Sequence, residues 1–82
     1  MNFCECVANK LWKLYGEGKI TWYGLEKASG CLHSTIMRIK DYSNKDITLE
    51  TLSKICHGLG VTLIEFLDDD DFRKCFEEVK YR

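Results

Sequence analysis

One local pattern occurs three times in this chain: a hydrophobic residue, a threonine, and a second hydrophobic residue four positions after the threonine. The three occurrences are Ile20-Thr21 with Leu25, Ile47-Thr48 with Leu52, and Val61-Thr62 with Phe66. Such a threonine caps a helix by accepting a hydrogen bond from a free backbone N–H, while the flanking hydrophobic residues pack across the helix start. The pattern therefore predicts where three helices begin.

Hydrophobic residues elsewhere recur at helical spacing. One stripe, formed by Phe3, Val7, Leu11 and Leu14, predicts a first helix that stops before the turn at residues 16–18. A second stripe predicts a helix that ends at Gly60 and consists of Leu49, Leu52, Ile55, Cys56 and Leu59. Because no strand-like alternation competes with these stripes, we expect an all-α fold of five helices, with a sixth at the C-terminus left open.

Length and composition limit the number of domains and the cellular compartments in which the protein is expected. The 82 residues are 45% hydrophobic, which suffices for one modest core. We expect a single domain over residues 1–82, with its core in about 3–67 and an acidic helix at about 69–81. No apolar run approaches the ~20 residues that span a bilayer, and the N-terminus lacks a signal-peptide pattern. We therefore expect a cytoplasmic protein that makes no membrane contact.

The chain has five cysteines, namely Cys4, Cys6, Cys31, Cys56 and Cys75. Their odd number, without an export signal, favours reduced thiols over a disulfide scaffold. Their spacing does not fit a zinc site, and the acidic run 68–71 lacks the spaced ligands of a calcium loop. We expect no metal and no cofactor. Buried packing is the default role for the thiols on hydrophobic stripes, and redox sensing is the alternative.

Charge is divided unevenly along the chain although the net charge is -1. Residues 10–45 contain seven Lys and Arg against three Asp and Glu, a net +4. Residues 46–82 contain five basic and nine acidic residues, a net -4. Since nucleic-acid binding depends on cations that face the phosphates, this asymmetry points to an anionic partner for the first half.

Residues 21–41 contain the pattern that bears most directly on function. A helix that begins after Thr21 can end tightly at Gly30, and a second short helix follows over about residues 32–41. Ile36 and Ile39 can pack back on the core. The opposite face of this second helix carries His33, Ser34, Met37, Arg38 and Asp41. Two helices with a short glycine turn, the second exposing polar groups, form the helix-turn-helix arrangement that enters a DNA major groove.

These residues resemble a known family. The run from Leu25 to Ile39, followed by Ile47-Thr-Leu-Glu-Thr-Leu52 and Leu59-Gly-Val-Thr-Leu63, resembles the Cro/CI-type (XRE) helix-turn-helix domain. Gly30, the two recognition-helix isoleucines and the Leu-Gly-Val ending all fall in the register of that family. The resemblance covers about Leu11 to Leu67 and implies the five-helix, lambda-repressor-like fold.

The resemblance also implies roles for single positions. The base-reading positions of the family fall on His33, Ser34, Met37 and Arg38. Its phosphate-contacting positions fall on Thr21 and Trp22, and on Ser43, Asn44, Lys45 and Thr48. Backbone N–H groups at the helix start after Thr48 can also face a phosphate.

Four residues depart from the usual pattern of the family. Trp22 stands where glutamine is common, which leaves only an indole N–H for a phosphate. Glu26 replaces a small residue between the two helices and must bend outward or find a cation. Leu32 replaces a serine or threonine cap that is worth about 1 kcal/mol. Tyr42 stands where glycine is frequent. None of these four differences disrupts the pattern of the family. They bear on the details of how the protein contacts DNA.

The C-terminal segment carries a further apolar stripe, made of Phe72, Cys75, Phe76 and Val79. This stripe either closes the core or forms a two-fold dimer interface, and we favour the dimer. A dimer would place two recognition helices about 34 Å apart on inverted half-sites of double-stranded DNA.

We therefore expect a homodimeric, sequence-specific transcriptional regulator. We expect no enzymatic activity, because no nucleophile, base and orienting carboxylate converge on one helix face. The main alternative is a protein-interaction module, such as an antitoxin or accessory factor that uses the same fold to hold a partner protein. A thiol-based sensor is the third reading.

Overall fold

The computed structural model describes residues 2–78, and these residues form helices without any strand. The helices are α1 (Phe3–Gly16), α2 (Trp22–Ser29), α3 (His33–Lys40), α4 (Leu49–Leu59), α5 (Leu63–Leu67) and α6 (Asp70–Glu78). The all-α prediction is confirmed, and the C-terminal helix that the sequence left open is present.

The three threonines cap their helices as predicted. Thr21, Thr48 and Thr62 each accept a hydrogen bond from the backbone N–H three residues later, at the starts of α2, α4 and α5. The glycines after α2 and α4 also behave as expected, since Gly30 and Gly60 both have φ of 73° and end their helices in the left-handed conformation. Local sequence therefore determines where these three helices begin and where α2 and α4 end.

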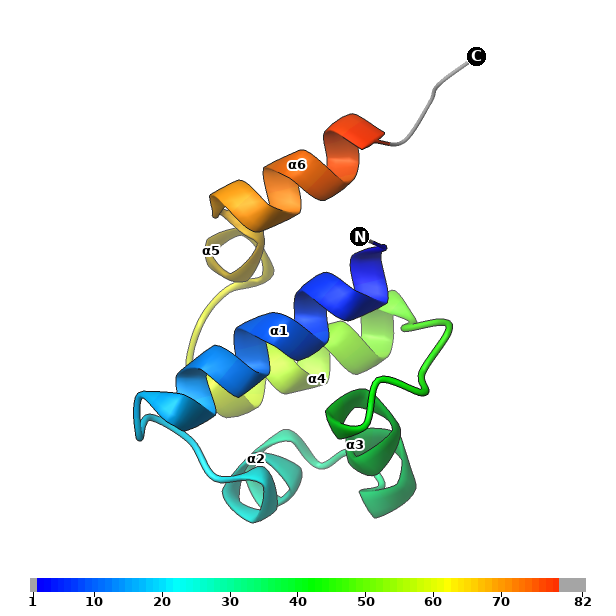
Figure 1. Cartoon of the computed structure of the whole chain (residues 1–82). Coiled ribbons are helices and arrows are strands. Elements are labelled where there is room, and N and C mark those ends of the chain that lie inside the picture. Colours follow the sequence, from blue (N-terminus) through cyan, green and yellow to red (C-terminus); the bar gives the residue numbers. More distant parts are fainter. Residues whose placement is uncertain (1, 79–82) are drawn as a thin grey trace.

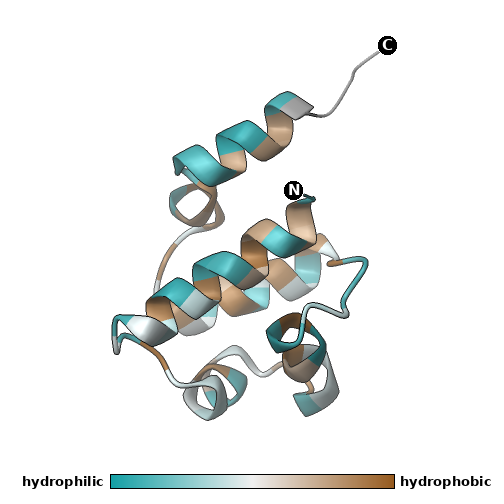
Figure 2. Cartoon of the chain, in the orientation of Figure 1, coloured by the Kyte–Doolittle hydropathy of each residue, from teal (hydrophilic) through white to brown (hydrophobic). Residues whose placement is uncertain are grey.

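The arrangement of the helices separates two ends of the molecule. α2 packs on α4 and on α3, whereas α1 packs on both α3 and α6. In Figure 1, α2 and α3 lie on one side of α1, and α5 and α6 lie on the other. The hydrophobic faces turn inward, as the brown segments in Figure 2 show. All six helices contribute to a single cluster of buried residues.

The apolar stripe of α6 closes this core. Phe72 is fully buried, and its ring centroid lies 5.7 Å from that of Phe3 and 5.6 Å from that of Phe66. Cys75 is buried as well. The prediction that Phe72 and Cys75 face a second chain is therefore wrong, because packing on α1 and α5 already removes them from solvent. Phe76 remains 41% exposed, and Val79 lies outside the described residues.

A polar contact ties α1 to the segment that begins α6. The Lys10 ammonium lies 3.0 Å from the carboxylate of Asp69, donates to the carbonyl oxygen of Phe66 and sits 4.6 Å from the ring centroid of that residue. Burial tends to raise the pKa of Asp69, but the Phe72 N–H and the Lys10 ammonium outweigh it, so the pKa lies below its ordinary value. Asp69 therefore stays ionised and holds the start of α6 on α1.

Candidate nucleic-acid interface

The turn between α2 and α3 is short and internally bonded. The N–H of Gly30 donates to the carbonyl oxygen of Glu26 at 3.2 Å. The hydroxyl of Ser29 donates to the same carbonyl at 3.4 Å and accepts the N–H of Cys31 at 3.2 Å. Because Ser29 is itself buried, these bonds set the angle at which α3 leaves the turn.

α3 has one buried face and one exposed face. Ile36 and Ile39 are buried in the core, as the spacing predicted. On the other side His33, Ser34 and Arg38 are exposed, and Met37 is half-buried. The structure thus places the four predicted base-reading residues on one helix, with His33, Ser34 and Arg38 open to solvent and Met37 partly packed against the core. α6 lies across α1 from this face and does not cover it (Figure 1).

Two contacts far apart in sequence hold α2 and α3 in place. The indole N–H of Trp12 on α1 donates to the carbonyl oxygen of Lys40, the last residue of α3, at 2.9 Å. Gly58 of α4 lies so close to α2 that an added Cβ would be 2.8 Å from the backbone nitrogen of Ser29. The absence of a side chain at Gly58 therefore permits the close packing of α4 against the end of α2.

Trp22 does not match its predicted role as a phosphate contact. Its side chain is 6% exposed, and its ring lies 5.0 Å from that of Trp12 in an edge-on contact. The indole N–H is buried and has no hydrogen-bond partner. A large aromatic side chain gains more from packing than from contact with water, so the ring packs inward instead of reaching out to a phosphate.

The predicted contacts Thr21 and Thr48 lie at helix starts, and both hydroxyls are used in capping. Thr21 accepts the N–H of Gly24 at 3.0 Å, and Thr48 accepts the N–H of Thr51 at 3.1 Å. An α-helix leaves the N–H groups of its first turn without intrahelical partners, and one cap bond satisfies only one of them. Any phosphate at these two positions would therefore meet the remaining backbone N–H groups.

The predicted contacts Ser43, Asn44 and Lys45 belong to a loop that folds back on the end of α3. The N–H groups of Ser43 and Asn44 both donate to the carbonyl oxygen of Arg38, at 3.0 and 3.1 Å. These two N–H groups are thus occupied, and phosphate contact by Ser43 or Asn44 would come from the side chain. Ser43 and Lys45 are exposed, and Asn44 is half-buried.

Asp41 and Tyr42 shape the first turn of this loop. The hydroxyl and N–H of Ser43 bond to the Asp41 carboxylate and hold its pKa below the ordinary value, so an anion stays beside the end of α3. Tyr42 has φ of 64°, a left-handed conformation that favours glycine and that a tyrosine seldom adopts. Its hydroxyl donates to the side-chain oxygen of Asn9 on α1.

Sequence reasoning missed one contact at this interface, the pair formed by Glu26 and His33. The Glu26 carboxylate lies 2.9 Å from Nδ1 of His33, across the turn from α2 to α3. The Glu26 side chain is 18% exposed and that of His33 is 69% exposed. That Glu26 must bend outward or find a cation was the available signal; in the structure its carboxylate instead meets an imidazole nitrogen seven residues further along.

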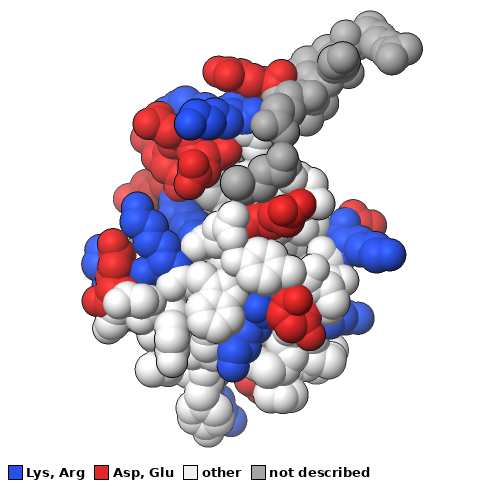
Figure 3. Space-filling view, viewed as in Figure 1, with Lys and Arg blue, Asp and Glu red and all other residues white. Residues whose placement is uncertain are grey.

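Acidic side chains gather at the far end of the molecule from α3. Figure 3 shows them over α5 and the start of α6, where Asp68, Asp69, Asp70 and Asp71 lie. On the same view the surface over α2 and α3 is mostly uncharged, with a few scattered basic and acidic side chains. On the face shown, the positive excess of residues 10–45 is therefore not gathered into one patch.

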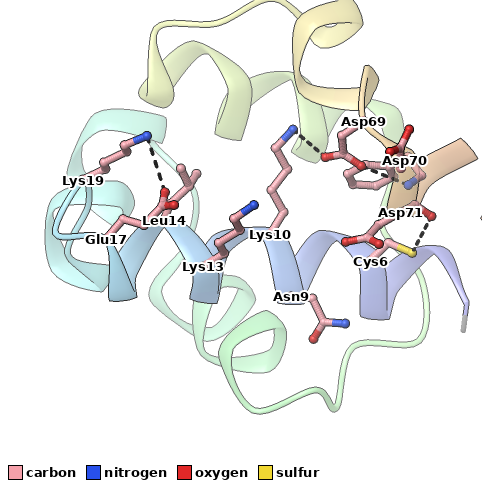
Figure 4. A pocket seen from close by; sticks show the side chains of 11 residues that line it. Cys6, Asn9, Lys10, Lys13, Leu14, Glu17, Lys19, Asp69, Asp70 and Asp71 are labelled. Atoms are coloured by element: carbon pink, nitrogen blue, oxygen red, sulfur yellow. Dashed lines mark hydrogen bonds and ion pairs between the residues drawn. The ribbon is translucent and has the colours of Figure 1, made fainter.

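A pocket of about 470 Å³ lies between α1 and the segment from α5 to α6 (Figure 4). Lysines on one side meet aspartates on the other. Lys10 pairs with Asp69, and Lys19 lies 3.4 Å from the carboxylate of Glu17. Because these charges neutralise one another and the pocket is remote from α3, we assign no chemistry to it. Over residues 2–78, no three His, Cys, Asp or Glu side chains lie together as a metal site would require.

The thiols in the described part of the chain are free and mostly buried. Burial, together with the neighbouring Cys75 thiol, raises the pKa of Cys6 to about 11. Burial also raises the pKa of Cys4 and Cys56. Because a protonated thiol is a poor nucleophile, these cysteines suit packing better than redox sensing.

Comparison with known proteins supports this reading of the geometry. Residues 10–71 match the Cro/C1-type HTH DNA-binding domain. No curated protein and no solved structure matches the chain significantly. No helix among residues 2–78 has the length and apolar character needed to cross a membrane. The family match covers more than half of the chain and agrees with the capped helices, the Gly30 turn and the exposed face of α3. The chain therefore belongs to the Cro/C1-type helix-turn-helix DNA-binding domains, which have the lambda-repressor-like fold.

Proposed function

We propose that this protein is a sequence-specific transcriptional regulator that inserts α3 into the DNA major groove. The observation that carries the proposal is that α3 has two different faces. Its isoleucines are buried in the core, and the opposite face is polar and exposed. The major groove admits one α-helix and presents a distinct pattern for each base pair. On this face Arg38 suits a guanine, and Met37 suits a thymine methyl group. His33 and Ser34 complete the set of proposed base contacts.

Phosphate contacts on both sides of α3 would hold it in register. We assign them to the start of α2 after Thr21, to the side chains of Ser43, Asn44 and Lys45, and to the start of α4 after Thr48. Lys45 is the exposed cation of this set. The Trp22 side chain is left out, because its N–H is buried.

We also propose that the protein binds as a homodimer on inverted half-sites. α3 has eight residues and can read only a few base pairs, so two copies about 34 Å apart would supply the specificity that a regulator needs. Among the stripe residues that the structure describes, Phe76 is the one that remains open to a second copy.

Selection of bound sequences from random duplex DNA tests binding, symmetry and spacing together. We expect an inverted repeat with half-site centres about 10 base pairs apart. Arg38→Ala should weaken binding to the selected site by about 1 to 3 kcal/mol and relax one position in each half-site. Failure to enrich any sequence, together with co-purification of a partner protein and no salt-sensitive DNA affinity, would favour the protein-interaction module.

A further inference from the structure

Glu26 and His33 meet at the point where the helix-turn-helix faces solvent. Glu26 lies on α2, and His33 is the first residue of α3. Their side chains touch through one short contact, 2.9 Å between a carboxylate oxygen and Nδ1. The carboxylate is largely covered, whereas the imidazole is mostly exposed. The covered partner can therefore restrain a ring whose other edge is free.

The chemistry of the contact determines where the imidazole proton lies. An ionised carboxylate only accepts hydrogen bonds, so Nδ1 must be the donor. In a neutral imidazole only one nitrogen carries a proton, and Nε2 then keeps its lone pair. Because the two ring nitrogens point away from each other, this lone pair is directed away from α2. A carboxylate that fixes a histidine tautomer in this way also fixes the orientation of its ring.

We propose that Glu26 is a positioning residue that holds neutral His33 in the Nδ1–H form, so that Nε2 meets the major groove as a hydrogen-bond acceptor. This inference rests on the proposed function of α3. An acceptor at this position selects a base with a donor on its major-groove edge, namely the N4 amino group of cytosine or the N6 amino group of adenine. Glu26 thus influences specificity without touching DNA.

The tautomer can be measured in the free protein without DNA. Nitrogen-15 NMR of the imidazoles at about pH 8, where an ordinary histidine is neutral, distinguishes the two tautomers. His57, exposed near the end of α4, provides an internal reference in the same sample. We expect the Nδ1–H form to predominate at His33, and Glu26→Ala to shift His33 to the same tautomer distribution as His57. Equal distributions at His33 and His57 in the parent protein would overturn the proposal.

The effect on specificity needs a second experiment. Selection from random duplex DNA with the parent, Glu26→Ala and His33→Ala should show cytosine or adenine preferred at one half-site position. Both variants should reduce that preference by about five- to tenfold at the same position, while the position read by Arg38 keeps its base. A Glu26→Ala selection identical to that of the parent refutes the positioning role.

The two experiments separate two kinds of failure. If no DNA is enriched by the parent protein, the proposed function fails, whatever the NMR result. If DNA is enriched and the tautomer or the base preference does not depend on Glu26, only the present inference fails. Glu26→Ala should fold normally, since the family usually has a small residue there, and a thermal melt followed by circular dichroism verifies this.

Discussion

Gly58 allows a sharp test of how α2 is held on α4. In the Gly58→Ala variant the new Cβ would lie 2.8 Å from the backbone nitrogen of Ser29, 3.0 Å from its Cα and 3.1 Å from the carbonyl carbon of Ala28. These are backbone atoms, which no side-chain rotation can move aside. The variant can form only if α2 and α4 separate by a few tenths of an ångström or more.

The expected magnitude follows from two opposing terms. Alanine stabilises a helix by up to about 1 kcal/mol relative to glycine. Overpacking a close contact costs about 1 to 3 kcal/mol, and the upper part of that range applies here because the neighbours are backbone. Gly58→Ala should therefore lower the free energy of unfolding by about 1 to 2 kcal/mol. In a domain of this size this corresponds to a fall in Tm of about 4 to 15 °C.

Gly16→Ala is the matched control. Gly16 is the last residue of α1, and an added Cβ there has no heavy atom within 4 Å. The same substitution should therefore leave Tm unchanged or raise it slightly. Thermal and urea unfolding followed by circular dichroism measures both variants. If Gly58→Ala is as stable as the parent or more stable, the close approach of α4 to α2 is refuted, together with the role of Gly58 in placing the helix-turn-helix.

Three further predictions concern single side chains. Lys45→Ala should weaken binding to all DNA sequences alike and reduce the slope of log affinity against log salt by about one unit; an unchanged slope argues against a phosphate contact. Tyr42→Phe should cost about 1 kcal/mol of stability through loss of the hydroxyl bond to Asn9, measured by urea unfolding, and an unaltered midpoint would show that the bond contributes nothing. The pKa of Asp69 is lower in the folded protein than in the unfolded chain, so its stabilising effect is complete above the unfolded value of about 4 and is lost as pH falls through the folded value. Asp69→Asn should therefore lower stability at neutral pH and flatten the loss of stability below about pH 4, and parallel urea-unfolding curves for both proteins across that range would contradict this linkage.

In the acidic helix α6, the hydrophobic stripe predicts the helix itself but not what covers its apolar side. The spacing of Phe72, Cys75 and Phe76 predicted a helix with one apolar side, and that helix is present as α6. What covers the apolar side depends on the direction in which the chain leaves α5. In the structure Phe3 and Phe66 cover Phe72, so this part of the stripe serves the core rather than a second chain.

The elements that the sequence alone determined are those whose causes lie within a few residues. The threonine caps, the glycine helix ends and the spacing of Ile36 and Ile39 act over one or two helical turns, so helix starts, helix ends and the exposed face of α3 could be predicted. The polar side chains of α3 were identified from that same local periodicity and from the family register.

The tertiary structure alone decided the features that depend on partners distant in the chain. Trp22 turns inward because its ring packs against Trp12 of α1, which lies ten residues earlier in the chain. Glu26 meets His33 across the turn between two helices. Gly58 is needed because α4 approaches α2 closely. Each depends on how two helices are placed relative to each other. Burial and close packing are properties of the assembled core, and a single stretch of sequence does not contain both sides of such a contact.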